Sequence, residues 1–376
     1  MKFSSYIVKI VSPCNLNCSY CYEYNSKDDS WKKKPKIMSE EVAEKLAERI
    51  LEHSLGSKNT IVPIIFHGGE PLMAGLDHIQ KLVNIFKKKI SPHKKIEFGM
   101  QTNGTLITPE HINFFEKERI AIGLSCDGPP DINDIYRVNH SGHGLGHKVD
   151  TALNLLKKSS SFNTILCVIN PLSDPIKVWN YFKSFNPKSI DFLLPHGTYD
   201  ELPQNWKTGS TIYANWMLKI FDLWYSGDHS HIRIRTFEEF IKGLSGGIQT
   251  LESFGINPVT LIIVATDGAY EGVDTLKVTG SNNHVLGMDV FKNSFDDASL
   301  HPKVTMRQLG ISGLSQTCKM CEYKKVCGGG YLPHRYSNEK KFNNPSIYCE
   351  DIKKMISHIY ENVKETLIND KKKQSI

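Results

Sequence analysis

The segment Tyr6-Ile-Val-Lys-Ile-Val-Ser-Pro-Cys14-Asn-Leu-Asn-Cys18-Ser-Tyr-Cys21 joins an apolar run to three closely spaced cysteines. The apolar run, interrupted at Lys9, predicts a buried β-strand that leads directly into the thiols. A structural zinc site is closed by four ligands, whereas three thiols can hold an iron–sulfur cube that keeps one iron open. We therefore expect a metal centre with an open position at the end of this strand.

Outward from this segment, short apolar runs alternate with amphipathic stretches six times. One such stretch begins with Ser39 as a helix N-cap and places Val42, Leu46 and Ile50 on one face. The expected strands are Tyr6–Val11, Ile61–Phe66, Glu97–Gln101, Ile120–Ser125, Thr164–Ile169 and Ile190–Leu194. The alternation predicts an α/β fold, a partial (β/α)6 TIM-type barrel of parallel strands with crossover helices. Because ligands in such barrels bind at the carboxyl ends of the strands, the first cysteines and the polar strand ends should form one site.

The remainder of the chain departs from this alternation. A helix is expected at Ser210–Tyr225 and a β-hairpin at Val259–Val278, which turns near Asp267-Gly268. A second helix at Asp351–Leu367 is expected to end in a lysine-rich disordered tail. We expect two domains, with residues 1–235 forming the barrel and residues 236–376 forming a smaller C-terminal domain with a final helix.

A second group of cysteines lies in this C-terminal part, at Cys318, Cys321, Cys327 and Cys349. Four thiols can close a metal site completely, and their spacing fits zinc as well as an iron–sulfur cluster. Two further cysteines, Cys126 and Cys167, are isolated within apolar stretches and are predicted to be small buried hydrophobic residues.

The composition of the chain excludes several classes of protein. The 376 residues carry a net charge of +6 with no clustered basic stripe, so nothing favours a nucleic-acid partner. No run of 18 apolar residues is present and the N-terminus is not a signal peptide, which predicts a cytoplasmic protein with no membrane partner. In that compartment thiols stay reduced, so the nine cysteines indicate metal rather than disulfides.

The spacing Cys14-x3-Cys18-x2-Cys21 after the first strand resembles the signature of the radical S-adenosylmethionine (SAM) superfamily. Gly68-Gly69-Glu70-Pro71, after the second strand, is similar to the GGEP motif of that family. The resemblance implies a [4Fe–4S] cluster on the three cysteines, whose open iron binds SAM. Reductive cleavage of SAM would then give a 5′-deoxyadenosyl radical, so the cofactor carries the chemistry and the protein positions it.

The same resemblance implies which residues contact SAM. Tyr20 matches the position near the adenine, and the Gly68–Pro71 backbone with Glu70 matches the site of the methionine ammonium group. Ser125 and Arg137 match positions that meet the ribose and the carboxylate. Asn103 and Asn170, at strand ends, are weaker candidates. For Asn103, Asn170 and Ser125, an ordinary role in a turn or cap is an equal alternative.

The late cysteines resemble a SPASM-type auxiliary iron–sulfur domain. Such a domain supplies ligands for two auxiliary clusters, but this chain has no cysteine between Cys167 and Cys318, and Tyr331 occupies one further ligand position. Cys318, Cys321, Cys327 and Cys349 match the ligands of the remaining cluster. We therefore expect two [4Fe–4S] clusters in total, one that cleaves SAM and one auxiliary.

SPASM-type enzymes mostly modify peptides. The segments from Cys327 to Ser337 and from Phe342 to Cys349 resemble maturases that build three-residue cyclophanes on ribosomal precursor peptides (RiPPs). The implied function is abstraction of a β-hydrogen from a precursor peptide residue, followed by a C–C crosslink to an aromatic ring. Anaerobic sulfatase maturation, which forms formylglycine, is the alternative, and the missing auxiliary site speaks against it. Thioether formation and peptide epimerisation stay open, and a non-catalytic zinc-binding peptide adaptor is an alternative from another class.

Three residues outside these motifs are candidates for further roles. Asp274 aligns with the catalytic base of the sulfatase-maturating family, although it could instead be a hairpin turn residue. His334 and Arg335 could contact substrate, but pinning the glycine-rich loop is the favoured role. The expected partners are a ribosomally made precursor peptide and a reductant such as flavodoxin or ferredoxin.

Overall fold

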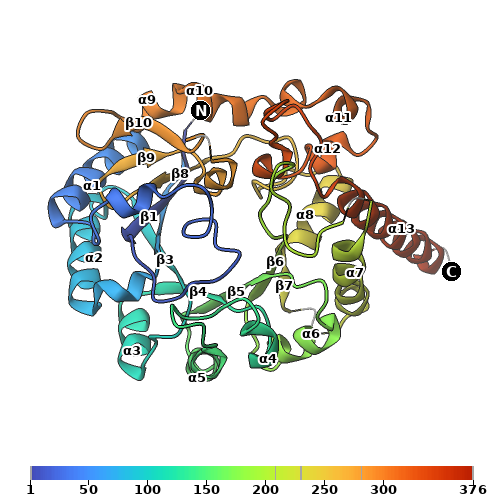
Figure 1. Cartoon of the computed structure of the whole chain (residues 1–376), viewed down its shortest axis with the longest axis horizontal. Helices are drawn as coiled ribbons and strands as arrows, with labels where there is room; N and C mark the ends of the chain where they lie inside the picture. The colour runs from blue at the N-terminus through green and yellow to red at the C-terminus, as the bar shows by residue number, and fades with distance from the viewer. Residues whose placement is uncertain (1, 208, 229–230, 281, 375–376) are drawn as a thin grey trace. The chain divides into compact units, whose positions relative to one another are not determined.

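The computed structural model describes residues 2–207, 209–228, 231–280 and 282–374, although not the side chains at 367 and 369–374 (Figure 1). The chain divides into two compact units, each of which is discontinuous in sequence. The first unit comprises Met1–Cys167, Ser184–Lys188 and Thr260–Met306. The second unit comprises Val168–Lys183, Ser189–Val259 and Arg307–Ile376. These units are defined by contacts between residues, whereas the boundary predicted at residue 235 separates two functional domains. That boundary stays a prediction.

The first unit contains the predicted parallel sheet, whose strand order is β10-β9-β8-β1-β2-β3-β4-β5. Strands β1 to β5 are all parallel to their neighbours. Their bounds are β1 Ser5–Val11, β2 Ile61–Gly68, β3 Lys95–Thr102, β4 Ile120–Ser125 and β5 Phe162–Val168. The predicted α/β class with a parallel sheet is therefore confirmed, with strand ends within about two residues of those expected from the apolar runs.

Helices cover one side of this sheet along the rim of the unit (Figure 1). They are α1 Glu40–Leu55, α2 Leu76–Ile90, α3 Pro109–Glu118, α4 Pro130–Asn133 and α5 Gly146–Leu156. Ser39 is the N-cap of α1, because its hydroxyl accepts the backbone N–H of Val42 at 3.2 Å. Leu46 and Ile50 are completely buried on the inner face of α1, as their spacing predicted.

The alternation of β-strand side chains decides what faces the opposite side of the sheet. The even-numbered residues Val8, Ile64 and Phe66 are fully buried. Because successive side chains point to opposite faces, Lys9 and its register partner His67 point the other way. The polar site described below therefore starts from the face of the sheet opposite to these apolar residues.

The predicted hairpin joins the same sheet beside β1. Strand β8 Leu261–Val264 pairs in parallel with β1 and antiparallel with β9 Ala269–Glu271, which pairs with β10 Val285–Asp289. The turn contains Gly268 at φ 84°, a conformation that glycine tolerates without strain. The hairpin ends earlier than expected, because Asp274 is the first residue of a 3-10 helix, η3 Asp274–Thr279. Helices α9 Phe295–Leu300 and α10 Pro302–Thr305 complete this unit.

The second unit is mostly helical. It contains α6 Pro175–Lys183, α7 Ile212–Tyr225, α8 Arg235–Leu244, α11 Gln316–Met320, α12 Lys324–Cys327 and α13 Cys349–Gln374, with the short parallel pair β6 Ser189–Leu193 and β7 Arg233–Ile234. Helix α13 packs on α7 and α8. The lysine-rich tail that we expected to be disordered is helical to Gln374. Among the residues that the structure describes, no helix has the length and apolarity needed to cross a membrane.

Candidate functional site: two groups of cysteines and a buried ion-pair cluster

The loop that carries Cys14, Cys18 and Cys21 is held against the end of β2 by backbone contacts. The N–H of Gly69 donates to the carbonyl of Val11 at 3.0 Å, and the N–H of Glu70 donates to that of Pro13 at 3.1 Å. A Cβ at Gly69 would lie 2.0 Å from the Pro13 carbonyl oxygen, so only glycine fits there. Gly69 and Glu70 of the GGEP motif thus hold the end of the second strand in contact with the cysteine loop.

The three thiols lie in surroundings that disfavour a free thiolate. Burial raises the pKa of Cys14 to about 12 and that of Cys21 to about 11. Burial also raises the pKa of Cys18. The sulfur of Cys14 nevertheless accepts the backbone N–H of Leu16 at 3.4 Å, a contact that favours its anion. Thiolates in such a place need a cationic centre, and the iron of a cluster supplies one.

Arg137 and Tyr20 are brought together beside these cysteines. The guanidinium Nη1 of Arg137 donates to the Tyr20 hydroxyl at 2.9 Å, and that hydroxyl donates to Oδ2 of Asp127 at 2.6 Å. Arg137 is only 6% exposed, yet its buried Nε has no hydrogen-bond partner among the described residues. A buried donor without an acceptor fits a site for a ligand carboxylate. The sequence did not identify Asp127, which orients the Tyr20 hydroxyl.

The Glu70 carboxylate is fully buried and makes three hydrogen bonds within the protein. It accepts the N–H of Leu72 at 3.0 Å, the hydroxyl of Thr102 at 2.7 Å and the N–H of Asn103 at 2.7 Å. Glu70, which follows β2, is therefore hydrogen-bonded to the end of β3. The side-chain amide of Asn103 in turn lies 3.8 Å from the sulfur of Cys14, so the structure brings Asn103 to the first cysteine.

The two remaining SAM candidates have local contacts. The Ser125 hydroxyl, at the end of β4, accepts the side-chain amide of Gln101 at 2.7 Å. Asn170 belongs to the second unit, where its side-chain oxygen accepts the N–H of Leu172 at 3.1 Å. Asn170 thus has the turn contact that its ordinary alternative role predicts.

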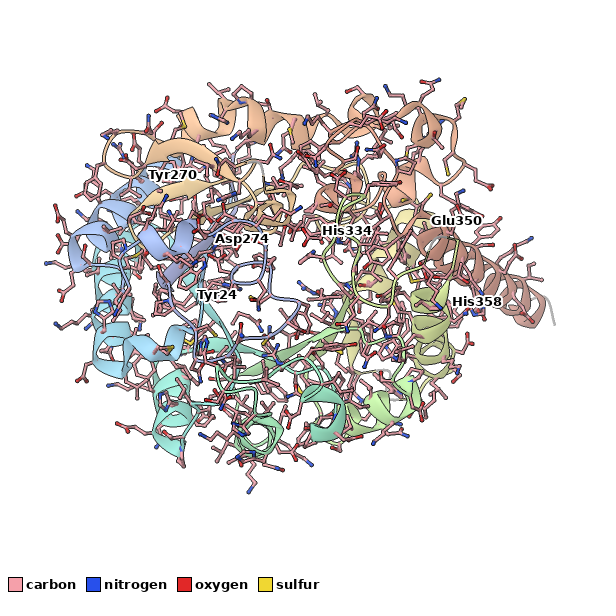
Figure 2. The ribbon with its side chains drawn as sticks, in the orientation of Figure 1. Tyr24, Tyr270, Asp274, His334, Glu350 and His358 are labelled. Atoms are coloured by element: carbon pink, nitrogen blue, oxygen red, sulfur yellow. The ribbon has the colours of Figure 1, made fainter. Side chains whose placement is uncertain are left out.

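Asp274 belongs to a buried ion-pair cluster centred on Lys9, which we call the Lys9 cluster (Figure 2 labels Asp274). The ammonium group of Lys9 lies 2.8 Å from Glu23, 3.0 Å from Glu271 and 3.1 Å from Asp274. Lys277 pairs with Glu23 at 2.5 Å. The exposed fractions of these five side chains are 11% or less, and Lys34 lies 3.8 Å from Glu271, so three lysines balance three carboxylates in this cluster.

The Lys9 cluster fixes the ionisation of Asp274. Burial opposes the charged form, but Lys9 above all holds the pKa of Asp274 well below its ordinary range. Burial also opposes the charge of Lys9, while Asp274, Glu23 and Glu271 raise the pKa of that lysine. The Tyr22 hydroxyl donates to Oδ2 of Asp274 at 3.1 Å. Asp274 is therefore an oriented anion next to the residue that follows Cys21, and not a hairpin turn residue.

The sequence missed most of the Lys9 cluster, although one signal was present. A lysine within the apolar run Tyr6–Val11 interrupts a strand that is otherwise apolar, and such a residue needs a buried partner. The partners of Lys9 lie 14 to 265 positions away in the chain, and the periodicity of single strands contains no information about them.

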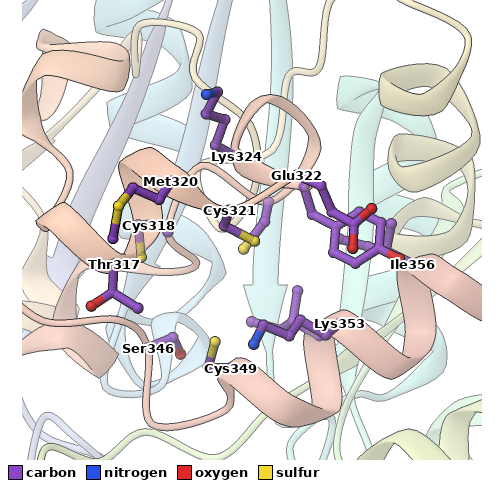
Figure 3. A pocket seen from close by; sticks show the side chains of 14 residues that line it. Thr317, Cys318, Met320, Cys321, Glu322, Lys324, Ser346, Cys349, Lys353 and Ile356 are labelled. Atoms are coloured by element: carbon purple, nitrogen blue, oxygen red, sulfur yellow. The ribbon is translucent and has the colours of Figure 1, made fainter.

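The late cysteines line one cavity of about 450 Å³ in the second unit (Figure 3). Cys318, Cys321, Cys327 and Cys349 all contribute to its wall, together with Gly329, Ser346 and Lys353. Burial raises the pKa of Cys327 to about 12 and that of Cys349 to about 11. Within the described residues, no three Cys, His, Asp or Glu side chains converge as a single-ion site would require. Four thiols on the wall of one cavity are the number of ligands that a [4Fe–4S] cluster or a closed zinc site needs.

The ligand position that Tyr331 occupies is filled by a polar network. The Tyr331 hydroxyl donates to Glu252 at 2.5 Å, and Arg307 pairs with the same carboxylate at 3.1 Å. Tyr331 is 8% exposed. The Tyr331 hydroxyl is thus hydrogen-bonded within the second unit, and the number of auxiliary clusters stays a prediction.

The isolated cysteines are buried, as the sequence predicted, and so are His334 and Arg335, which lie after the glycine run. Cys126 and Cys167 are buried, at 0% and 1% exposure. His334 is 3% exposed, and its Nε2 lies 3.3 Å from Nδ1 of His196 within the second unit. Arg335 donates to backbone carbonyls of neighbouring loops, which supports a role in pinning this region.

Comparisons with known proteins agree with this site. The model of the radical SAM superfamily matches residues 8–174. A cysteine-type anaerobic sulfatase-maturating enzyme of Clostridium perfringens is 28% identical over 93% of this chain and 94% of its own length. A serine-type enzyme of Bacteroides thetaiotaomicron is 31% identical over 86% of this chain and 81% of its own length. The solved structure of native anSMEcpe with bound AdoMet and Cp18Cys peptide is 26% identical, covers 97% of this chain and 99% of that chain, and has a TM-score of 0.82.

A parallel α/β sheet with three cysteines after its first strand, and four further cysteines around one cavity, indicate an iron–sulfur enzyme. With these comparisons, the chain belongs to the radical SAM superfamily. SAM and [4Fe–4S] clusters, including auxiliary clusters, are the cofactors of this superfamily and of the relatives named above. Membership excludes the non-catalytic zinc adaptor, which would have no use for a SAM-cleaving cluster.

The expected cyclophane-forming activity is wrong, because the similar proteins are anaerobic sulfatase-maturating enzymes over nearly the whole chain. The cyclophane resemblance rested on two short segments around the late cysteines. Those segments carry two of the four late cysteines, and similarity around candidate metal ligands says little about the reaction. The missing auxiliary site was likewise a weak argument against sulfatase maturation.

Proposed function

We propose that this enzyme oxidises a cysteine or serine side chain of a peptide substrate to formylglycine. The observation that carries the proposal is the similarity to anaerobic sulfatase-maturating enzymes across 93% of the chain. Cysteine-type and serine-type relatives match at similar identity, so the proposal covers both substrate residues. A solved relative with a bound peptide supports a peptide as the substrate.

In the first unit, Cys14, Cys18 and Cys21 would hold the cluster that binds SAM. Bound there, SAM supplies a 5′-deoxyadenosyl radical once the cluster donates one electron, which a ferredoxin or flavodoxin would provide. The residues that would contact SAM are Tyr20, Gly68, Gly69, Glu70, Pro71, Asn103, Ser125, Arg137 and Asn170. Arg137 has the strongest support of these, because its unpartnered Nε is available to a carboxylate.

Asp274 would receive the proton that the substrate loses. Oxidation of –CH2–XH to –CH=X, where X is sulfur or oxygen, removes one hydrogen atom, one proton and one electron. The hydrogen atom goes to the radical, the proton to the Asp274 carboxylate and the electron to the auxiliary cluster as oxidant. Lys9 and the Tyr22 hydroxyl keep this carboxylate ionised and oriented. In the cysteine case, water then hydrolyses the thioaldehyde, which releases hydrogen sulfide and gives the aldehyde.

In the second unit, Cys318, Cys321, Cys327 and Cys349 would hold the auxiliary cluster. With Tyr331 satisfied by Glu252, we propose one auxiliary cluster and two clusters in total. These residues would belong to a C-terminal auxiliary domain at 236–376, which follows a SAM-cleaving domain at 1–235.

The test uses the anaerobically reconstituted enzyme, SAM, a strong reductant and two matched peptides that carry a single cysteine or serine. Mass spectrometry should detect loss of two hydrogens from the serine peptide and replacement of the thiol by an aldehyde in the cysteine peptide. A hydrazine probe should label either product. Loss of two hydrogens without aldehyde labelling, or 5′-deoxyadenosine formation with both peptides unchanged, would contradict the proposal. The peptide encoded beside the gene should be tested in parallel.

A further inference from the structure

Arg335, the last residue of the 3-10 helix η6 Leu332–Arg335, is a buried cation without a carboxylate partner. It is 7% exposed, and its Nη2 donates to the carbonyls of Gly313 at 2.7 Å and Phe342 at 3.0 Å. Its Nε is buried and has no hydrogen-bond partner. Among the described residues, no carboxylate lies within ion-pair distance of its guanidinium. A buried charge of this kind is costly unless an opposite charge compensates it.

The position of the guanidinium relates it to the cavity of the late cysteines. A Cβ built at Gly329 would lie 3.6 Å from Nη1 of Arg335, and Gly329 is part of the cavity wall. Gly328, Gly329 and Gly330 all have positive φ, between 63° and 81°, so this run follows a path that other residues would not adopt. Burial lowers the pKa of Arg335, whereas the sulfurs of Cys318 and Cys327 would raise it if they were ionised.

We propose that Arg335 is the counter-cation of the auxiliary cluster and raises its reduction potential. The inference rests on the proposed placement of that cluster in the cavity. An iron–sulfur cube with four thiolates carries net negative charge, and reduction adds another negative charge. A fixed positive charge in a buried region favours the reduced form more than the oxidised form. Arg335 is thus a positioning residue that acts through the cluster, not a catalytic residue.

The other cations near the cavity provide a comparison for this effect. Lys353 lines the cavity, but its side chain is 43% exposed and pairs with Glu350 at 3.2 Å. Water and the Glu350 carboxylate screen this charge, so its effect on the cluster should be much smaller. Lys324 also lines the cavity, and its ammonium donates to the Lys319 carbonyl at 3.0 Å. Arg335 is therefore distinguished by burial, not by charge alone.

The experiment isolates the auxiliary cluster within the full chain. In a background with Cys14, Cys18 and Cys21 replaced by alanine, only the late cysteines can hold iron. Into this background we would place Arg335→Gln, Arg335→Lys and the control Lys353→Gln. Redox titration monitored by electron paramagnetic resonance gives the midpoint potential, and iron analysis reports cluster occupancy. Both readouts are independent of peptide oxidation, so they separate this inference from the proposed function.

The expected result is a lower midpoint potential for Arg335→Gln, a value near that of the background for Arg335→Lys, and a smaller shift for Lys353→Gln. If Arg335→Gln loses iron while Arg335→Lys keeps it, the charge requirement is also supported. The proposal is overturned if Arg335→Gln retains iron with an unchanged potential, if both Arg335 variants lose iron, or if the background binds no iron. The last result would also remove the auxiliary cluster from the proposed function.

Discussion

The two units that carry the cysteine groups differ in how their buried charges are compensated. In the first unit, Lys9 and Lys277 lie among Glu23, Glu271 and Asp274, so the buried cations and anions compensate one another within the protein. In the second unit, Arg335 is buried and its contacts are to backbone carbonyls. A charge that the protein itself neutralises needs no ligand, whereas an uncompensated one indicates where an anionic group binds.

The first unit also contains a buried cation with an unsatisfied hydrogen-bond donor, which is Arg137. Its Nη1 contacts the Tyr20 hydroxyl, but its Nε has no partner. Each cysteine group therefore has one buried arginine with an unpartnered Nε. For Arg137 the proposed anion is the SAM carboxylate, and for Arg335 it is the auxiliary cluster. The Lys9 cluster differs from both because its task is to orient one carboxylate.

Removal of the first cysteine group should have the largest effect. Replacement of Cys14, Cys18 and Cys21 by alanine should abolish SAM cleavage, because the open iron is lost with its ligands. Chromatography of 5′-deoxyadenosine formed under strong reductant measures this. The control Cys126→Ala removes a buried thiol that donates to the Gly128 carbonyl, and it should keep cleavage. Continued cleavage in the triple variant would refute the assignment of this cluster.

Neutralisation of Asp274 should separate SAM cleavage from product formation. Asp274→Asn should lower peptide oxidation by about 10²- to 10⁴-fold, the usual range for a lost general base, while 5′-deoxyadenosine still forms. The control Asp267→Asn changes a carboxylate that pairs with Lys34 and is 38% exposed, so oxidation should persist. An undiminished rate in Asp274→Asn would show that Asp274 is not the proton acceptor.

Disruption of the Lys9 cluster should destabilise the first unit. Lys9→Met leaves three buried carboxylates with less compensation, which should lower the free energy of unfolding by about 3–5 kcal/mol. The matched control Lys81→Met removes an exposed ion pair with Glu40 and should cost about 0–1 kcal/mol. Urea unfolding of the holoenzyme under anaerobic conditions compares the two. Equal effects would contradict the difference between buried and exposed pairs.

The pH dependence of that stability should be the smallest effect near neutrality. The pKa of Asp274 is lowered from 3.8, so its contribution is present above that value and is lost as pH falls through the lower folded pKa. The pKa of Lys9 is raised from 10.5, so its contribution is present below that value and is lost as pH rises through the higher folded pKa. Lys9 also lowers the pKa of His67 and of His284, so the difference between wild type and Lys9→Met should be constant only from about pH 7.5 to pH 9, above the range in which these histidines change charge. A steep change within that window would show that the pair titrates there.

The sequence predicted the parts of the molecule that depend on local pattern. The apolar runs predicted β1 to β6, Ser39 predicted the start of α1, and Asp267-Gly268 predicted the turn of the hairpin. Parallel strand ends also explain why Val11 contacts Gly69 and why Cys14 lies near Asn103. Each of these features follows from spacing along a short stretch or from the direction of neighbouring strands.

The remainder depended on contacts between distant residues. For Asp274 the sequence left a catalytic base and a hairpin turn residue as alternatives, and it did not predict the buried ion pair with Lys9, which is 265 positions away in the chain. The isolation of Arg335 from carboxylates is likewise a property of packing that no sequence pattern reports. The reaction itself was predicted wrongly from two short segments, because similarity around candidate metal ligands does not identify the substrate.

The most direct test of this account is the iron content of three anaerobically reconstituted proteins. Wild type should hold about eight irons per chain, as two [4Fe–4S] clusters require. The triple alanine variants of Cys14, Cys18 and Cys21, and of Cys318, Cys321 and Cys349, should each hold about four. Zinc in the late cavity, or an unchanged iron content in either variant, would contradict the account.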